Sequence, residues 1–123
     1  MKIKQLVQIT QVLERFVNKK LSIKLSYKIM KFLKTTEADI TFYKEKLTKI
    51  IEEYSERAED GSIKMIDNNF KIKESEIDNF NKSYSELEEI KVELPNIKFK
   101  LDELEEIKVS PAELYVLDSL IEE

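Results

Sequence analysis

The chain has 123 residues, of which 41% are hydrophobic and 37% are charged, and its formal net charge is −4. This length and hydrophobic content predict a single domain, residues 1–123, with a modest core. The absence of Cys and His excludes disulfides, thiolate metal sites and histidine-based catalysis. One Gly and two Pro favour long helices, so we expect a mainly α fold of the α+β class.

Residues 1–58 are predicted to form an N-terminal antiparallel helical hairpin. In the first helix, which should end near Asn18, apolar residues recur every three or four positions at Leu6, Ile9, Leu13 and Phe16. A longer helical pattern extends over residues 22–57. Thr35 or Thr36 could cap a new helix within it, so one helix and two helices both stay open.

Residues 59–123 are predicted to begin with a small β hairpin. After Gly61, which suits a left-handed turn, the turn should centre on Asp67-Asn68. The predicted cross-strand pairs are Ile63 with Ile72 and Met65 with Phe70. A third helix should follow, with a capping box formed by Ser75 and Asp78 and an end near Glu88. Its apolar stripe consists of Ile77, Phe80, Tyr84 and Leu87.

The last part of the chain is predicted to be an extended segment and a C-terminal helix. Residues 90–101 alternate in polarity, and a hairpin there would pair Val92 with Phe99, although the extension is better supported than the pairing. The helix begins at Ser110-Pro111, with Ser110 and Glu113 in a capping box. We expect an apolar tail that docks on the chain itself or on a partner, formed by Leu114, Leu117 and Ile121.

The sequence favours a protein that is not an enzyme and that needs no cofactor or metal. The remaining groups for acid–base chemistry are carboxylates, Lys and Tyr. Adjacent acidic pairs such as Glu52-Glu53 point in different directions on a helix and are best interpreted as a solvated acidic face. The chain also contains no Gly-rich phosphate loop, nucleophile elbow or zinc spacing.

A basic surface on the second helix is the best candidate for partner binding. Residues 1–50 hold 12 Lys and Arg against 4 Asp and Glu, whereas residues 51–123 hold 9 against 21. The candidate partner-binding residues are Lys20, Lys24, Lys28, Lys31, Tyr27 and Phe32. The alternative is that the lysines are solvated or paired with the acidic second half of the chain.

Several stretches resemble a family of small proteins of unknown function carried by phages and prophages of Gram-positive bacteria. These stretches are residues 59–65 (EDGSIKM), 87–94 (LEEIKVEL) and 109–123 (VSPAELYVLDSLIEE), and residues 21–33 (LSIKLSYKIMKFL) are similar in character. The resemblance implies phage origin and no particular activity.

The expected function is therefore that of a phage protein that binds another protein without catalysis, as an inhibitor or modulator of a bacterial host factor, such as a defence factor. A structural or assembly accessory of the phage tail or virion is the alternative, and a nucleic-acid-associated regulator is the third choice. The expected partner is a host bacterial protein, a homo-oligomer is also open, and nucleic acid is disfavoured. No signal peptide or membrane span is expected, so the predicted location is the host cytoplasm, with the virion as the alternative.

Overall fold

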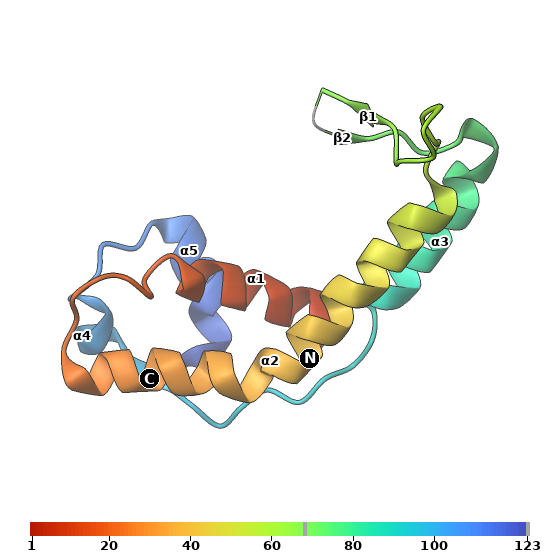
Figure 1. The fold of residues 1–123 in the computed structure, drawn as a ribbon. Coiled ribbons are helices and arrows are strands. Elements are labelled where there is room, and N and C mark those ends of the chain that lie inside the picture. Colours follow the sequence, from red (N-terminus) through yellow and green to blue (C-terminus); the bar gives the residue numbers. More distant parts are fainter. Residues whose placement is uncertain (68, 123) are drawn as a thin grey trace. The chain divides into compact units, whose positions relative to one another are not determined.

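The computed structural model describes residues 1–67 and 69–122 (Figure 1). It confirms the mainly α, α+β class. The chain forms two compact units, which we call unit 1 (residues 1–40 and 91–123) and unit 2 (residues 41–90). Neither boundary coincides with the division near residue 58 that the sequence suggested, because the second helix contributes residues to both units. Whether the chain unfolds as one domain stays a prediction.

Unit 1 begins with two consecutive helices, α1 (Ile3–Glu14) and α2 (Ile23–Tyr54). Figure 1 shows α1 and the first part of α2 running in opposite directions, as the predicted helical hairpin requires. The backbone N–H of Lys2 donates to Gln5 Oε1 (3.0 Å) at the start of α1. The predicted stripe is confirmed, since each of its members is at most 1% exposed: Leu6, Ile9, Leu13 and Phe16.

α2 is one helix, which settles the choice that the sequence left open. Thr36, the candidate break, is 2% exposed. Its hydroxyl donates to the carbonyl oxygens of Phe32 (2.9 Å) and Leu33 (3.3 Å). A hydroxyl that is satisfied by the preceding turn can be buried without interrupting the helix.

The C-terminal part of unit 1 contains short elements. They are β3 (Phe99–Lys100), α4 (Leu101–Leu104), α5 (Pro111–Leu117), the 3₁₀ turn η2 (Asp118–Leu120) and β4 (Ile121–Glu122). The possible hairpin pair of Val92 with Phe99 is not formed. Phe99 instead pairs in parallel with Ile121, and the backbone N–H of Val92 donates to the carbonyl oxygen of Met1 (2.8 Å).

The core of unit 1 joins α1, the first part of α2 and the C-terminal elements. Its buried members are Leu6, Ile9, Leu13, Phe16, Leu25, Ile29, Phe32, Phe99, Leu104, Ile107, Leu117 and Leu120. α5 packs against α1, and Leu114 and Ile121 are partly buried against the core. The C-terminal tail therefore docks within the chain.

The start of α5 shows the predicted capping box. The backbone N–H of Glu113 donates to Ser110 Oγ (3.1 Å), and that of Ser110 donates to Glu113 Oε1 (2.9 Å). Glu113 also forms an ion pair with Arg15 just beyond α1. The Ser110 backbone hydrogen bond and the Arg15 guanidinium lower the pKa of Glu113, against the opposing effect of burial.

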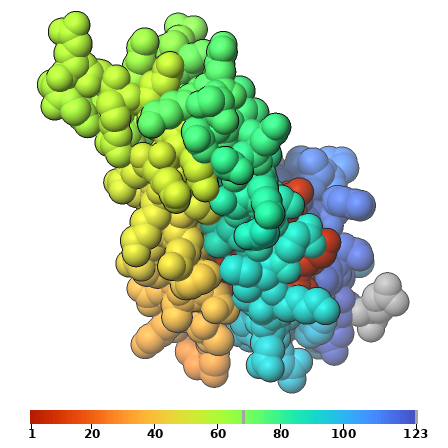
Figure 2. Space-filling view, turned by 90° about the vertical axis from the view of Figure 1, so that its right-hand side faces the viewer, coloured from red at the N-terminus to blue at the C-terminus, as the bar shows by residue number. Residues whose placement is uncertain are grey.

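Unit 2 contains the predicted β hairpin, with strands β1 (Met65–Ile66) and β2 (Asn69–Phe70). The pairing of Met65 with Phe70 is confirmed. In the turn, Asp67 has a positive φ of 52°, and Asn68 lies outside the described residues. Figure 2 shows this region, in yellow-green to green, on the surface of unit 2.

The predicted pairing of Ile63 with Ile72 is wrong. Ile63 pairs with Arg57, and Ile72 pairs with Ser55. Lys71 still donates its N–H to the carbonyl oxygen of Lys64 (3.1 Å), but beyond this pair the segment after α2 takes the place of the opposite strand. The N–H of Glu56 donates to the carbonyl oxygen of Lys71 (2.7 Å), and the carbonyl oxygen of Glu56 accepts from the N–H of Lys64 (2.8 Å).

Unit 2 ends with the 3₁₀ turn η1 (Glu74–Glu76) and helix α3 (Ile77–Glu88), whose end agrees with the prediction. The predicted capping box of Ser75 and Asp78 is absent, because the 3₁₀ turn moves the cap position to Glu76. The Phe80 ring lies edge-on to Tyr54 and stacks with Tyr84. Burial raises the pKa of Tyr43, and its hydrogen bond with Tyr84 adds to this effect.

We expect Leu117→Ala to lower the free energy of unfolding by about 2–5 kcal/mol, because it leaves a cavity in the core of unit 1. Leu117 is 1% exposed. Tyr115→Ala on the same helix is the control, since this side chain is 85% exposed and its loss should change stability by only about 0.5 kcal/mol. Denaturant unfolding of both variants measures the difference, and equal midpoints would contradict the docking of α5.

We also expect Glu113 to make stability depend on pH. A carboxyl whose pKa is lowered by folding stabilises the folded chain above its usual pKa, and this contribution is lost as the pH falls through the folded value. Glu113→Gln should therefore be less stable than the parent chain at neutral pH, and the difference should shrink in acid. Unfolding curves from pH 7 down to pH 3 test this. A difference that does not change with pH would exclude the role of the charge.

Candidate functional site

The best candidate for a functional surface lies on unit 1, between the α1–α2 connection and the first part of α2. A groove with a volume of about 240 Å³ opens there. We call it the α2 groove, and its lining residues are Phe16, Val17, Lys19, Leu21, Ser26, Ile29, Met30 and Leu33. Val17 is 54% exposed and Met30 is 48% exposed. The groove is therefore open to solvent although most of its lining is apolar.

A second apolar surface lies along α2 beside this groove. Ile23, Tyr27 and Met30 are separated by four and three residues, so they share one side of the helix. We call them the α2 stripe. Ile23 is 90% exposed and Tyr27 is 54% exposed. α2 thus has one apolar side in the core and another that faces solvent, and Met30 belongs to both the stripe and the groove.

The predicted set of four lysines does not form one surface. Lys20 precedes α2, so the helical spacing that linked it to Lys24 does not apply. Lys24 is exposed. The ammonium group of Lys31 lies 5.7 Å from the centre of the Tyr27 ring, beside the α2 stripe. Lys28, one turn after Lys24 on α2, is only partly exposed.

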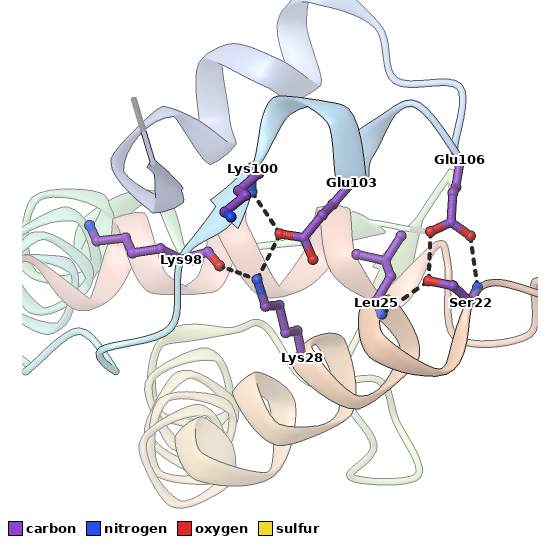
Figure 3. Close-up of polar contacts among 7 residues, drawn as sticks. All are labelled: Ser22, Leu25, Lys28, Lys98, Lys100, Glu103 and Glu106. Carbon is purple, nitrogen blue, oxygen red and sulfur yellow. Dashed lines mark hydrogen bonds and ion pairs between the residues drawn. The ribbon is translucent and has the colours of Figure 1, made fainter.

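Lys28 binds the C-terminal part of unit 1, as Figure 3 shows. Its Nζ donates to Glu103 Oε1 (2.7 Å) and to the carbonyl oxygen of Lys98 (2.9 Å). The same oxygen of Glu103 accepts from the backbone N–H of Lys100 (3.0 Å). The hydrogen bond from Lys28 is the main cause of a lowered pKa at Glu103, and the charge of Lys24 contributes to it.

A second carboxylate holds the start of α2. Glu106 Oε1 accepts from the backbone N–H of Ser22 (2.7 Å), and Glu106 Oε2 accepts from Ser22 Oγ (2.6 Å). Ser22 Oγ in turn accepts from the N–H of Leu25 (3.3 Å), so Ser22 caps the helix. A carboxylate at a helix N-terminus is also favoured by the helix dipole. Figure 3 shows Glu103 and Glu106 directed to the same part of α2.

Phe32 and the predicted tail residues belong to unit 1's core or pack against it. Phe32 has no exposed surface and belongs to the core, so its inclusion in the candidate surface is wrong. The tail residues Leu114, Leu117 and Ile121 pack in or against the same core. Of the predicted partner-binding residues, Lys20, Lys24, Tyr27 and Lys31 stay exposed.

The sequence interpretation missed Val17, Ile23 and Met30. Their signal was present in part, since Ile23, Tyr27 and Met30 follow the same three- and four-residue spacing as a buried stripe. α2 also carries a stripe through Ile29 and Leu33, which packs in or against the core.

Two further observations concern metal binding and membrane crossing. Within residues 1–67 and 69–122, no group of three or more acidic side chains is placed to hold a metal ion. Over the same ranges, no helix combines the length and apolar character that crossing a membrane requires.

Comparison of the chain with protein-family models, with curated protein sequences and with solved structures finds no match. The resemblance to phage proteins therefore stays a prediction.

We expect Lys28→Ala to lower the free energy of unfolding by roughly 1–3 kcal/mol, because it removes hydrogen bonds of a charged group to partly buried acceptors. The side chains of Lys28 and Glu103 are 23% and 11% exposed. Lys24→Ala is the matched control, because the Lys24 side chain is exposed one turn earlier on α2. This variant should change the free energy of unfolding by only about 0.5 kcal/mol. Denaturation of both variants tests this, and equal stabilities would show that the contact contributes nothing.

Proposed function

We propose that the chain is a non-enzymatic protein-binding protein of phage origin, which binds a bacterial host factor and inhibits or redirects it. The observation that supports binding is the solvent-exposed apolar surface formed by the α2 groove and the α2 stripe. Large apolar side chains that gather in one exposed place are typical of protein interaction sites, whereas single ones are common on any surface. The proposed phage origin rests on the sequence resemblance. The proposed inhibition is one of the roles expected of a small phage protein that binds a host factor, and the resemblance itself implies no activity.

The composition of this surface agrees with a protein partner. Tyr and Met are enriched at the centres of protein interfaces, and both occur in the α2 stripe. Lysines lie beside these apolar residues. The ammonium group of Lys19 lies over the Phe16 ring, and that of Lys31 lies over the Tyr27 ring. An apolar centre with a charged rim is the usual arrangement of an interface.

A pull-down from host lysate with the tagged chain tests the proposal when it is made with matched variants. We expect Met30→Glu to abolish the capture of a host protein, because it places a charge in the centre of the surface. Tyr115→Glu is the control, since it adds the same charge at an exposed aromatic residue of α5 and should retain capture. Circular dichroism must show that both variants are folded.

Capture that persists in the Met30→Glu variant would contradict the proposed surface. Absence of any host protein with the parent chain, together with a stoichiometric amount of the chain in purified phage particles, would instead favour the virion role.

A further inference from the structure

The size of the α2 groove favours side chains of a partner over a small molecule. Its volume of about 240 Å³ is below the roughly 300–1,000 Å³ that is typical of small-molecule sites. A groove of this size has room for one or two apolar side chains, which is how the anchor residues of protein interfaces are bound. The occupant should therefore be an apolar anchor presented by a larger partner.

The geometry of the α2 stripe favours a helix as the element that carries this anchor. Ile23, Tyr27 and Met30 form a ridge that extends about 10 Å along α2 at the helical rise of ~1.5 Å per residue. A ridge with this spacing packs into the grooves of another helix. Amphipathic helices bind such surfaces through apolar residues at positions i, i+3, i+4 and i+7.

The charges around this surface determine the charge of the partner. Between residues 14 and 37 the chain holds seven Lys and Arg residues but only two carboxylates, Glu14 and Glu37. Arg15 is paired with Glu113, and Lys28 is paired with Glu103. No ion pair involves the other five within the described part of the chain: Lys19, Lys20, Lys24, Lys31 and Lys34.

The acidic second half of the chain cancels little of this positive charge through direct contacts. Glu103 of α4 and Glu106 of the loop after it contact the start of α2 (Figure 3). Glu103 forms an ion pair with Lys28. Glu106 accepts hydrogen bonds from the neutral Ser22, so its negative charge remains at the start of α2, nine residues before Lys31. The lysines beside the α2 stripe thus keep a net positive field that attracts acidic groups and repels basic ones.

We propose that the α2 groove and the α2 stripe together bind an acidic amphipathic helix of the partner protein. This inference rests on the proposed function and specifies the partner's binding element. The apolar side of the partner helix packs on Tyr27 and Met30, with one side chain inserted in the groove. Its carboxylates face Lys31 and Lys34 on α2 and Lys19 at the groove wall.

An anionic membrane carries the same charge, but the shape of the surface argues against it. The groove is concave, with the buried Phe16 and Ile29 in its lining. A lipid surface would contact the exposed α2 stripe but would not fill the groove, whereas a protruding side chain of a helix does both. Vesicle binding is therefore an outcome that would contradict the proposal.

A designed peptide provides a direct test with the full chain. The probe is a fluorescent peptide of about 18 residues, long enough to form a helix, with Leu at i, i+3, i+4 and i+7 and Glu at the outer positions. The matched probe has Lys in place of each Glu. By fluorescence anisotropy, we expect the acidic peptide to bind at least about tenfold more tightly than the basic one, with a preference that weakens as salt is added.

Variants of the chain separate the apolar and electrostatic contributions. Met30→Glu should abolish binding of the acidic peptide. The double variant Lys31→Glu with Lys34→Glu should weaken the acidic peptide about tenfold or more and improve the basic one. Lys46→Glu with Lys49→Glu is the control, because it makes the same charge change farther along α2 and should leave the preference unchanged.

Equal binding of the two peptides, or binding that the Lys31 and Lys34 reversal does not change, would overturn the proposal. Anionic phospholipid vesicles that bind the chain in a Met30-dependent manner, when the acidic peptide does not bind, would also overturn it. Host-protein capture that depends on Met30 but not on Lys31 and Lys34 would leave the proposed function intact. It would reject only the proposal that the partner binds through an acidic helix. If the folded parent chain neither captures a host protein nor binds the acidic peptide, both the proposed function and the acidic-helix proposal are rejected.

Discussion

The orientation of α2 about its own axis determines which residues of unit 1 are exposed. The core binds one side of the helix through Leu25, Ile29 and Phe32. Glu103 and Glu106 bind a neighbouring side through Lys28 and Ser22. With these two sides occupied, the α2 stripe faces solvent. A rotation of α2 that buried Tyr27 would break both carboxylate contacts and expose part of the core, so the apolar surface is a consequence of the same contacts that hold the unit together.

This arrangement places apolar surface in water, and the lysines around it change what that surface can bind. Two copies of the chain that approached each other through their α2 stripes would bring their lysines together, and like charges at close range oppose association. The surface is therefore better suited to a partner of opposite charge than to a second copy. On this proposal a homo-oligomer would use a different surface. The half-exposed Met65, Ile66 and Phe70 of the β hairpin in unit 2 form another exposed apolar group in the described part of the chain.

The parts of the fold that were predicted correctly depend on residues close together in the sequence. The α1 stripe, the Ser110 capping box and the Met65–Phe70 pair each follow from spacings within a few residues. The wrong predictions concern contacts with distant segments. Ile63 and Ile72 fit a simple hairpin, but residues 55–57 provide other backbone partners. Ile63 pairs with Arg57 and Ile72 pairs with Ser55. Phe99 pairs with Ile121, and nothing in the local alternation of residues 90–101 indicates a parallel partner at the end of the chain.

The candidate site could be predicted only in part, for a related reason. Helical spacing identifies residues that share a side of α2, and it correctly grouped Lys24, Lys28 and Lys31. It does not identify which neighbouring segment each side meets. Lys28 became a structural residue because a carboxylate 75 positions later reaches it, and Phe32 belongs to the stripe that the core buries. A helix with two apolar stripes buries the one that matches its neighbours in the fold. The exposed stripe is identified only when those neighbours are known.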